Sequence, residues 1–311
     1  MNKVLITGGA GYLGSVMARK LLEENFYVTV IDNLMYRQLS MLNLFAFSTF
    51  NFIHGDVRDS AFLQRQVSKH DIIIPLAAIV GMEACNQKPK DAVDINYNQI
   101  KDICNVLAKD QKIIMPNTNS QYGSSEAIIT EESPFKPLSL YAKTKCDAEK
   151  LILDTAGVTL RLATVFGVSP RMRQDLLVND FVYKSLVDKY LVLFESHYKR
   201  NYIHVEDIAN TFVFVINNFE KCVSNTFNVG LSSANLSKLQ LAEKIKEYIP
   251  NLVIYENDFA KDKDQRNYIV SNEKLEKLNW YPSYDLDFGI KQLLHAYPIL
   301  IKKNNERFTN L

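Results

Sequence analysis

Tyr141 and Lys145 are the residues of this chain whose types and spacing most directly suggest chemistry. They stand four residues apart in Tyr141-Ala-Lys-Thr-Lys145, so a helix would place the phenol and the ammonium on one face. A nearby cation lowers the pKa of a phenol from its usual value of about 10 and favours the phenolate, which is a base. Taken alone, such a pair is more typical of a helix surface, so its meaning depends on the elements that position it.

The segment from Lys3 to Asp32 predicts the first of these elements. The apolar run that begins at Val4 predicts a strand buried on both faces, residues 15–24 predict an amphipathic helix, and residues 27–31 predict a second strand. The turn between the first strand and the helix has the dinucleotide-binding spacing Gly9-x-Gly11-x-x-Gly14. Such glycines allow a tight turn, the approach of a pyrophosphate and close helix packing, and the helix N-terminus attracts phosphate.

Asp32 follows the second strand at the position of an acid that bonds the hydroxyls of an adenosine ribose. A carboxylate there would repel a 2′-phosphate, so the sequence favours NAD over NADP as the cofactor. A glycine-rich turn without a ligand is the alternative interpretation, but the strand, helix, second strand and acid together favour a bound dinucleotide. The positive nicotinamide ring would then strengthen the effect of Lys145 on Tyr141.

Strand-like and helix-like segments alternate through the first half of the chain and predict an α/β fold with a doubly wound parallel sheet, the Rossmann architecture. We expect further strands at 52–54, 71–76, 112–115 and 158–162, and helices at 60–68, 94–108 and 141–156. Ligands bind at the carboxyl ends of such strands. The residues expected on or just beyond that edge are Thr7, Asp32, Asp56, Ala77, Thr118 and Leu162.

Beyond Phe166 the pattern is looser and predicts a smaller C-terminal α/β lobe that is joined to the sheet. We expect loops at 169–173 and 258–264, helices at 179–187, 206–217 and 236–249, and a strand at 202–205. Residues 1–168 would form the NAD-binding domain, and 198–222 would return to it. Residues 169–197 and 223–311 would form the lobe that binds the second substrate.

The composition argues against several other classes of function. The formal net charge is +1 and no extended basic run occurs, so we expect neither a nucleic-acid nor a membrane partner. No segment approaches the ~20 apolar residues of a membrane span, and the first strand begins too early for a signal peptide. The four cysteines have neither CxxC nor metal spacing, so we expect free buried thiols, no metal, and a soluble cytoplasmic protein.

The chain resembles the extended short-chain dehydrogenase/reductase family, and within it the NAD-dependent nucleotide-sugar epimerase/dehydratase branch, over essentially its whole length. The motifs that carry the resemblance are Thr7-Gly8-x-x-Gly11-x-x-Gly14, Asp32, Gly55-Asp56-Val57, Leu76-Ala77-Ala78, Tyr122-Gly123, Tyr141-x-x-x-Lys145, Arg161-x-x-x-Val165-Phe166-Gly167 and Arg200-Asn-Tyr-Ile-His-Val-Glu-Asp207. The resemblance also implies a homodimer that forms through the helices at 94–108 and 141–156.

The resemblance implies roles for three residues at the reacting centre. Tyr141 would take the proton from a sugar hydroxyl while the carbon, usually C4, gives a hydride to NAD. Lys145 would hold the nicotinamide ribose and keep Tyr141 ionised, and Thr118 would bond the reacting oxygen. Ser120 is the second candidate for the role of Thr118.

The expected cofactor contacts follow the edge of the sheet. Asp56 and Val57 would hold the adenine amino group and one face of its ring, and the small residues Ala77 and Ala78 would let a ribose approach the backbone. The residues expected to contact NAD are Gly8, Gly11, Tyr12, Leu13, Gly14, Asp32, Asn33, Asp56, Val57, Leu76, Ala77, Ala78, Asn96, Tyr141 and Lys145.

The residues expected to bind a nucleotide-diphosphate sugar lie mostly in the second half of the chain. Arg200 and Arg266 match arginines that hold the diphosphate in this branch, and Asn179 stands where relatives bond the phosphates. Arg173 would be a further clamp, and Ser120 would contact the sugar. For any one arginine the alternative is a surface salt bridge, which contributes little to stability.

Departures from the family pattern narrow the reaction. Sugar 4,6-dehydratases that resemble this chain carry Asp-Glu after the catalytic Thr, whereas this chain has Asn119 and Ser120, which cannot do acid–base work near neutral pH. Related 3,5-epimerases carry a Cys at the position of Ser120, and Cys85 is expected to be a buried thiol. C4 epimerisation and net C4 oxidation with release of the ketone remain.

The runs that begin at Pro116 and Arg171 look most like those of bacterial GDP-heptose 4-dehydrogenases of capsule biosynthesis. The leading hypothesis is therefore oxidation of a GDP-linked sugar, GDP-manno-heptose, at C4, with a 2-keto acid such as 2-oxoglutarate reoxidising the cofactor. A C4-epimerase is the close alternative. A non-enzymatic NAD-binding regulator is a third hypothesis, but such proteins often lose the Tyr or the Lys, and this chain keeps both.

Two further residues have competing interpretations. His204 lies inside a β pattern with apolar neighbours, so we expect a structural histidine rather than an acid–base group. Tyr122 either lines the sugar pocket or covers the edge of the sheet.

Overall fold

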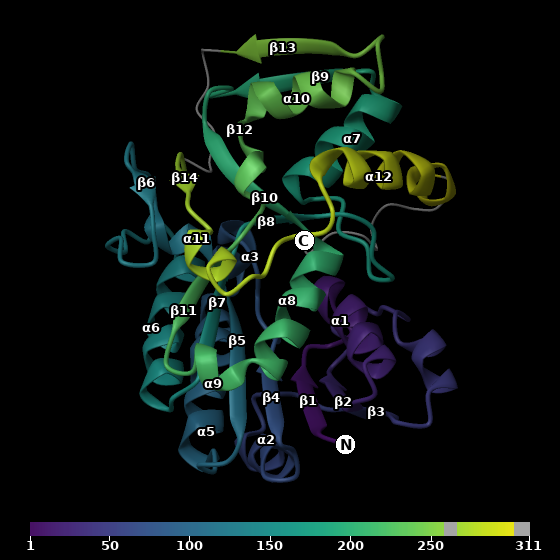
Figure 1. Cartoon of the computed structure of the whole chain (residues 1–311). Coiled ribbons are helices and arrows are strands. Elements are labelled where there is room, and N and C mark those ends of the chain that lie inside the picture. The colour runs from purple at the N-terminus through teal and green to yellow at the C-terminus, as the bar shows by residue number, and fades with distance from the viewer. Residues whose placement is uncertain (258–265, 302–311) are drawn as a thin grey trace.

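A seven-stranded parallel sheet forms the centre of the computed structural model, which describes residues 1–257 and 266–301. The strand order is β11-β7-β5-β4-β1-β2-β3 (Figure 1). Every neighbouring pair is parallel, so the expected doubly wound Rossmann sheet is confirmed. The strands are β1 (Lys3–Thr7), β2 (Tyr27–Asp32), β3 (Phe50–His54), β4 (Ile72–Pro75), β5 (Lys112–Thr118), β7 (Val158–Leu162) and β11 (Thr226–Val229).

Alternate residues of the central strands bury against helices on opposite faces of the sheet, because side chains along a strand alternate in direction. Val4 and Ile6 of β1 belong to an apolar cluster with α1 and α8, whereas Leu5 belongs to a second cluster with α2, α5 and α6 (Figure 1). The bounds of these helices are α1 (Tyr12–Glu23), α2 (Ser60–Val67), α5 (Gln99–Val106), α6 (Leu140–Asp154) and α8 (Val205–Asn217).

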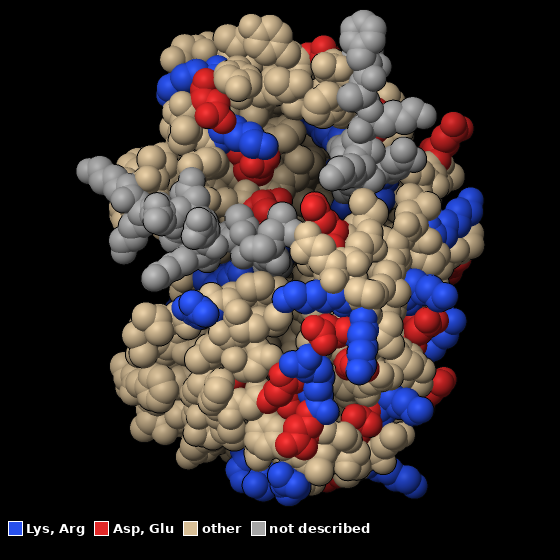
Figure 2. Space-filling view, turned by 180° about the vertical axis from the view of Figure 1, so that it is seen from behind, with Lys and Arg blue, Asp and Glu red and all other residues tan. Residues whose placement is uncertain are grey.

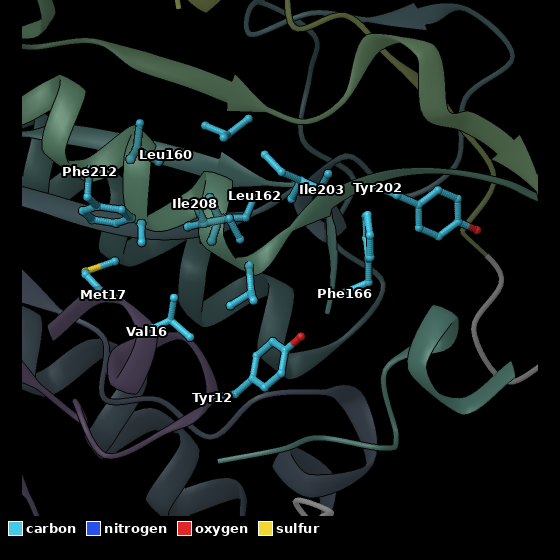
Figure 3. Packing of buried hydrophobic residues seen from close by; sticks show 14 of the residues in the cluster. Tyr12, Val16, Met17, Leu160, Leu162, Phe166, Tyr202, Ile203, Ile208 and Phe212 are labelled. Carbon is cyan, nitrogen blue, oxygen red and sulfur yellow. The ribbon is translucent and has the colours of Figure 1, made fainter. Parts of the chain in front are cut away.

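The packing of α1 against α8 anchors the helix that follows the glycine-rich turn. Val16 and Met17 of α1 share one apolar cluster with Ile208 and Phe212 of α8, and each of the four is at most 1% exposed (Figure 3). Burying side chains of this size stabilises the fold by roughly 1.5–3 kcal/mol each. The N-terminal end of α1 is therefore held firmly against the carboxyl edge of the sheet.

Two elements next to the site differ from their expected lengths. β5 continues beyond Met115 to Thr118, because it stays paired with β7 as far as Leu162. The helix expected at 94–108 is a π-helical turn, η2 (Asp94–Asn98), followed by α5, and the short helices α3 (Met82–Gln87) and α4 (Pro89–Val93) precede it. The π turn brings Asn96 to the loop after β4, and such turns often accompany functional sites.

A smaller lobe lies above the carboxyl edge of the sheet (Figure 1). Its strands form three small sheets, in which β10 pairs with β8 and β12, β9 pairs with β13, and β6 pairs with β14. The strands are β6 (Ile128–Ile129), β8 (Thr164–Phe166), β9 (Tyr190–Phe194), β10 (Lys199–His204), β12 (Asn235–Ser237), β13 (Val253–Asn257) and β14 (Ile269–Val270).

The remaining helices among the described residues of the whole chain are η1 (Leu42–Ala46), η3 (Asn119–Tyr122), α7 (Leu177–Val187), α9 (Phe219–Cys222), η4 (Ser232–Ala234), α10 (Lys238–Lys246), α11 (Glu273–Glu276) and α12 (Leu286–Leu300).

The pairing of β11 and β10 departs from the division expected from the sequence. β11 lies within residues 223–311, which were assigned to the lobe, yet it forms one edge of the central sheet against β7. β10, within the segment expected to return to the NAD-binding domain, pairs with β8 and β12 outside the central sheet. Four-residue β11 is too short to show a period of its own, so only its partner identifies its place. The division into two domains stays a prediction, and the loop expected at 258–264 lies outside the described residues.

Figure 2 shows Lys and Arg side chains lying beside Asp and Glu on the face that it draws. Within 1–257 and 266–301, no helix is long and apolar enough to cross a bilayer, and no group of His, Cys, Asp and Glu could hold a metal. All four cysteines are free; Cys85, Cys146 and Cys222 are buried as expected, whereas Cys104 is only half-buried.

Candidate active site

A cavity of about 900 Å³ lies at the carboxyl edge of the central sheet, between the sheet and the lobe. Its wall brings together residues from the loops after β1, β2, β4 and β5, from α6, and from the lobe. The residues predicted from the sequence that line it are Gly8, Gly11, Tyr12, Leu13, Gly14, Asp32, Asn33, Val57, Leu76, Ala77, Ala78, Thr118, Ser120, Tyr141, Lys145, Arg173, Arg200 and Arg266.

The glycine-rich turn has the shape that a bound pyrophosphate requires. Gly8 has a φ of +66°, and a Cβ on it would lie 2.5 Å from the Cα of Ala77. A Cβ on Gly14 would lie 2.5 Å from the Cα of Gly9, so glycine lets α1 pack directly on the turn. Gly11 is the N-cap of α1 and provides no side-chain cap for the N–H groups of the first helical turn, which have no partners inside the helix. These N–H groups suit an anion at the cavity wall.

Asp32 is held in place by the same turn. Its Oδ2 accepts the N–H of Ala10 at 3.0 Å, and its Oδ1 accepts the N–H of Leu34 at 2.8 Å. Burial raises the pKa of this carboxyl, and the two N–H groups oppose that shift. Each carboxylate oxygen can accept more than one hydrogen bond, so Asp32 can still bond ribose hydroxyls from the cavity wall. The turn and Asp32 therefore fit the adenosine half of NAD.

Tyr141 and Lys145 lie in the first turns of α6, as their spacing predicts. Ser139 caps this helix by accepting the N–H of Ala142 at 3.2 Å. Burial raises the pKa of Tyr141 to about 12, and Cys85 adds to the rise, whereas Arg173, Arg266 and a hydrogen bond with Thr118 lower it.

In the protein by itself, burial dominates the pKa of Tyr141, and the cations that oppose this rise most are arginines of the lobe. The effect of Lys145 on Tyr141 stays a prediction. Burial also lowers the pKa of Lys145 to about 8, while the nearby Glu149 opposes that shift. A lysine with this pKa carries its full charge only below that pH, so it is a weaker partner for the phenol than a surface lysine.

Thr118 and Ser120 stand together at the end of β5. The Thr118 hydroxyl donates to Ser120 Oγ at 2.9 Å and accepts the Ser120 N–H at 3.1 Å. The guanidinium of Arg266 also donates to Ser120 Oγ. Asn119, the other residue at the dehydratase acid–base positions, is 1% exposed and does not line the cavity. The two positions after Thr118 therefore offer a buried amide and a hydroxyl in place of the two carboxylic acids.

Residues 4–230 match the family described as the NAD dependent epimerase/dehydratase family. The chain belongs to this family. It is accordingly an enzyme with NAD as its cofactor, as the glycine turn and Asp32 indicate. A putative UDP-glucose 4-epimerase of Methanocaldococcus jannaschii is 27% identical over 320 residues, which are 98% of this chain and 99% of that protein.

A second relative and a solved structure bear the names of different reactions. The dTDP-D-glucose 4,6-dehydratase of Homo sapiens is 26% identical over 322 residues, which are 95% of this chain and 90% of that protein. The UDP-glucuronic acid 4-epimerase of Bacillus cereus, solved with UDP-glucuronic acid and NAD, superimposes with a TM-score of 0.84 at 23% identity, over 96% of this chain and 99% of that one. This epimerase shares the fold of the chain.

Asp56 is not on the cavity wall, although the sequence assigns it an adenine contact. Its carboxylate instead accepts two side-chain nitrogens of Arg58, at 2.7 and 2.9 Å, and the Asn33 side chain at 3.0 Å. The Arg58 guanidinium holds the pKa of this carboxyl well below its usual range. In this epimerase/dehydratase family member, Val57 and Asn33 line the cavity at that point.

Asn96 and Asn179 also lie away from the positions expected from the sequence, because the side chain of each is hydrogen-bonded to backbone groups. Asn96 Oδ1 accepts the Ile79 N–H at 2.8 Å, and its Nδ2 donates to the Ile79 carbonyl at 3.0 Å. Asn179 Oδ1 accepts the Gly167 N–H at 3.1 Å, and its Nδ2 donates to the Arg173 carbonyl at 2.8 Å. Neither lines the cavity, so they shape the loops that do.

The arginines of the lobe that line the cavity differ in their burial and in their hydrogen-bond partners. Arg200 is 2% exposed, lies over the Tyr268 ring at 5.6 Å and donates to the Lys199 carbonyl at 2.9 Å. Arg173 is paired with Asp175 through two nitrogens. Arg200 is therefore buried at the cavity, whereas Arg173 forms a salt bridge, and contact of either arginine with a ligand stays a prediction.

Arg171 is a cavity residue that the sequence analysis missed. It is 3% exposed, and its guanidinium lies 4.6 Å from the centre of the Tyr36 ring, which also lines the cavity. Residues two apart in an extended segment point the same way, so its spacing from Arg173 was a usable signal. A buried arginine at this wall is suited to an anionic ligand.

The residues that have competing interpretations in the sequence, His204, Tyr122 and Cys85, have structural roles. His204 is fully buried; its Nε2 pairs with Gln292 at 3.0 Å and its Nδ1 accepts the Glu206 N–H at 3.3 Å, which caps α8, so the expected structural histidine is confirmed. Tyr122 does not line the cavity, because its hydroxyl donates to Asn228 at 2.7 Å and accepts from Arg161 at 2.6 Å. Cys85 is fully buried, as expected.

Proposed function

We propose that this enzyme oxidises the C4 hydroxyl of a nucleotide-diphosphate sugar. The observation that supports this most directly is that Tyr141 and Thr118 line one cavity together with the glycine turn, and that a hydrogen bond with Thr118 lowers the pKa of Tyr141. A phenol in hydrogen-bond reach of a second hydroxyl suits proton abstraction from an alcohol. Arginines from the lobe, at the other side of the same cavity, suit a diphosphate.

Each residue then has a defined task. Tyr141 takes the proton of the C4 hydroxyl, and Thr118 bonds the same oxygen and fixes its orientation. Lys145 bonds the nicotinamide ribose, and its position one turn after Tyr141 keeps that ribose beside the base. Bound NAD supplies the hydride acceptor. Arg200 and Arg266 bond the diphosphate, with Arg173 as a further clamp, and Ser120 contacts the sugar.

The reaction we favour ends with release of the 4-keto sugar. A dehydratase would need an acid and a base beside Thr118, and this chain has the buried Asn119 and the hydroxyl of Ser120 there. The similarity of the runs at Pro116 and Arg171 to bacterial GDP-heptose 4-dehydrogenases supports GDP-manno-heptose as the substrate. We propose that a 2-keto acid such as 2-oxoglutarate is the second substrate, which is reduced to the 2-hydroxy acid as the cofactor is reoxidised.

C4 epimerisation is the second candidate, and the relative from Methanocaldococcus jannaschii, named as a putative UDP-glucose 4-epimerase, favours it. An epimerase returns the hydride to the other face of the same carbon, so it needs no second substrate. The residues Tyr141, Lys145 and Thr118 would serve both reactions in the same way. The fate of the hydride therefore has to be measured.

Product analysis separates the two reactions. Purified enzyme is incubated with GDP-manno-heptose, GDP-mannose and UDP-sugars, with and without 2-oxoglutarate, and products are identified by mass spectrometry. A product two mass units lighter that forms only with 2-oxoglutarate supports the dehydrogenase. An isomer that forms without it supports the epimerase, and loss of water from the sugar would contradict both.

Tyr141→Phe tests the assigned base. We expect hydride transfer to fall by roughly 10²–10⁴-fold, the usual contribution of a positioned acid–base group. The variant should still bind NAD, which is measured as the rise in melting temperature when NAD is added. Tyr190→Phe, at a half-exposed tyrosine of β9, is the matched control and should keep full activity. Unchanged hydride transfer in Tyr141→Phe would sink the assignment.

A dimer is a further proposal, and we place its contact on the outer faces of α5 and α6. These helices lie beside each other on one face of the sheet (Figure 1). Light scattering of the wild type and of Asn105→Arg, a change at an exposed position of α5, tests it. A dimer that persists in the variant would move the contact elsewhere.

A further inference from the structure

A chain of hydrogen bonds connects Tyr141 to the lobe. Tyr141 and Thr118 line the same cavity, where a hydrogen bond with Thr118 lowers the pKa of Tyr141. The Thr118 hydroxyl bonds Ser120 Oγ at 2.9 Å, and the guanidinium of Arg266 bonds the same Ser120 oxygen. Arg266 is 146 residues from Ser120 in sequence, so only the tertiary fold brings the arginine to the phenol. Ser120 is 7% exposed, so little water competes for these bonds.

The donor and the acceptor of each bond in this chain of hydrogen bonds can be assigned. A hydroxyl has one proton to donate and two lone pairs to accept, whereas a guanidinium can only donate. Ser120 Oγ must therefore accept from Arg266 at all times. When Tyr141 is ionised, Thr118 has to turn its proton toward the phenolate, and Ser120 can then donate its own proton to Thr118. All donors of the chain then point from Arg266 toward Tyr141.

We propose that Arg266 and Ser120 are positioning residues that stabilise the phenolate of Tyr141 through Thr118. This inference rests on the proposed function, in which Tyr141 is the base. It gives Arg266 a task at the reacting centre in addition to the diphosphate contact that the family resemblance implies. Because the arginine ends the chain with a permanent positive charge, it polarises both hydroxyls toward the phenol.

The other charged and titratable groups around Tyr141 lie outside this set of hydrogen bonds. Cys85 from α3 opposes ionisation of the phenol, and its own pKa is raised to about 11 by burial. Arg173, which is paired with Asp175, lowers the pKa of Tyr141 more than Arg266 does by charge alone. Lys145, on the same helix as Tyr141, has a pKa lowered to about 8 by burial. Arg266 is also among the groups that lower the pKa of Tyr141.

The proposal and a purely diphosphate-binding role predict different behaviour. If Arg266 serves only the diphosphate, its removal weakens nucleotide-sugar binding and Ser120→Ala has no effect on the phenol. If the chain stabilises the phenolate, both changes raise the pKa of Tyr141 in the absence of any sugar. Ser120→Ala is the sharper variant, because it removes one oxygen and leaves every arginine in place.

The test is a spectroscopic titration of Tyr141 in the full chain, with and without NAD. The ultraviolet phenolate signal is recorded for the wild type, Ser120→Ala and Arg266→Gln, each corrected with the same protein carrying Tyr141→Phe. We expect each change to raise the pKa of Tyr141 by about 1 unit. The double variant should shift it little further, because the two residues act in one chain.

Two controls keep the outcome decisive. Ser120→Thr keeps the hydroxyl and should titrate like the wild type. Arg200→Gln removes a neighbouring cavity arginine outside the chain and should leave the titration unchanged. An unshifted titration in Ser120→Ala or in Arg266→Gln overturns the proposal, as does an equal shift in Arg200→Gln. Because no sugar is present, failure of the proposed function would appear separately, as absence of sugar oxidation by the wild type.

Discussion

Buried polar side chains form a hydrogen-bonded cluster around α6, the helix that carries Tyr141 and Lys145. Glu149, one turn beyond Lys145, pairs with Arg161 and also accepts the Asn117 side chain. Asn117 in addition donates to the Lys145 carbonyl at 3.3 Å, so the residue before Thr118 is bonded to α6. The positions of the base, the lysine and the threonine are therefore set together.

Burial of Lys145 makes the stability of the protein depend on pH. The pKa of Lys145 is lowered from 10.5 to about 8 in the folded chain, so between these values the unfolded chain holds a proton that the folded chain has lost. Stability from this group therefore rises with pH across that window. Lys145→Met should be more stable than the wild type at pH 7 by about 1–3 kcal/mol, and the gain should shrink as the pH rises toward 10.

Denaturant unfolding at several pH values measures this difference. Lys143→Met, at an exposed position of the same helix, is the matched control and should change stability by less than ~0.5 kcal/mol at every pH. A gain in Lys145→Met that stays constant from pH 7 to pH 10 would show that the ammonium carries no burial penalty.

At the scale of single elements, the ends of α1 and α6 determine what the cavity can bind. α1 begins at the glycine turn, and α6 begins at Ser139, which also lines the cavity. Both helices are anchored by buried apolar faces, so small changes at their first residues act on the site more than on the fold. Two pairs of substitutions separate these effects.

Gly11→Ala and Gly14→Ala should have opposite consequences. A Cβ on Gly11 meets only the Gly8 carbonyl, at 3.2 Å, whereas a Cβ on Gly14 meets the Gly9 backbone at 2.5 Å. We expect Gly11→Ala to keep its stability and lose NAD affinity by tenfold or more, about 1.4 kcal/mol. Gly14→Ala should lose about 1–3 kcal/mol of stability, because α1 has to move. Calorimetric NAD titration and denaturant unfolding distinguish them, and equal stability of the two variants would contradict the packing argument.

Ser139→Ala removes the cap of the helix that carries Tyr141. We expect a loss of about 1 kcal/mol of stability and a several-fold lower rate of hydride transfer, because the first helical turn frays. Asp285 is the equivalent cap of α12, because its side chain accepts the Phe288 N–H at 2.8 Å, and it does not line the cavity. Asp285→Ala is therefore the control variant. The control should lose similar stability and keep the rate. A normal rate in Ser139→Ala would mean that the cap only stabilises the helix.

At the scale of the whole molecule, the cavity exists because the lobe is bonded to the central domain at a few buried points. Asp207 of α8 accepts the N–H groups of Ser283 and Tyr284, at 2.9 and 3.0 Å. Tyr12, next to the glycine turn, donates to the Gly167 carbonyl at 2.7 Å. These bonds connect the NAD-binding turn and α8 to the segments that carry the lobe arginines and α12.

Asp207→Ala tests one of these connections. Two N–H groups lose their acceptor in a site where Asp207 is 1% exposed, so we expect a loss of about 2–3 kcal/mol and weaker nucleotide-sugar binding. Asp207→Asn keeps one acceptor oxygen and should lose less. Unfolding curves and the KM for the sugar are the measurements. Unchanged values of both in Asp207→Ala would show that the lobe is held by its apolar contacts alone.

Local patterns are sufficient to predict six strands of the sheet, the glycine turn, Asp32 and the Tyr141–Lys145 helix. The reason is physical: strand alternation, helix spacing and glycine geometry depend on near neighbours along the chain. The absence of an acid beside Thr118 is likewise visible in two adjacent residues, Asn119 and Ser120.

The tertiary structure alone decides how distant residues share the cavity. Asn179 turns to the Gly167 backbone, Asp56 turns to Arg58, and the pKa of Tyr141 rises instead of falling, because burial outweighs the lobe arginines that lower it. Arg266 reaches Ser120 across 146 residues of sequence, a contact that no local period encodes. Such contacts depend on how the lobe packs over the sheet edge, and the energies of burial and charge there follow from that packing.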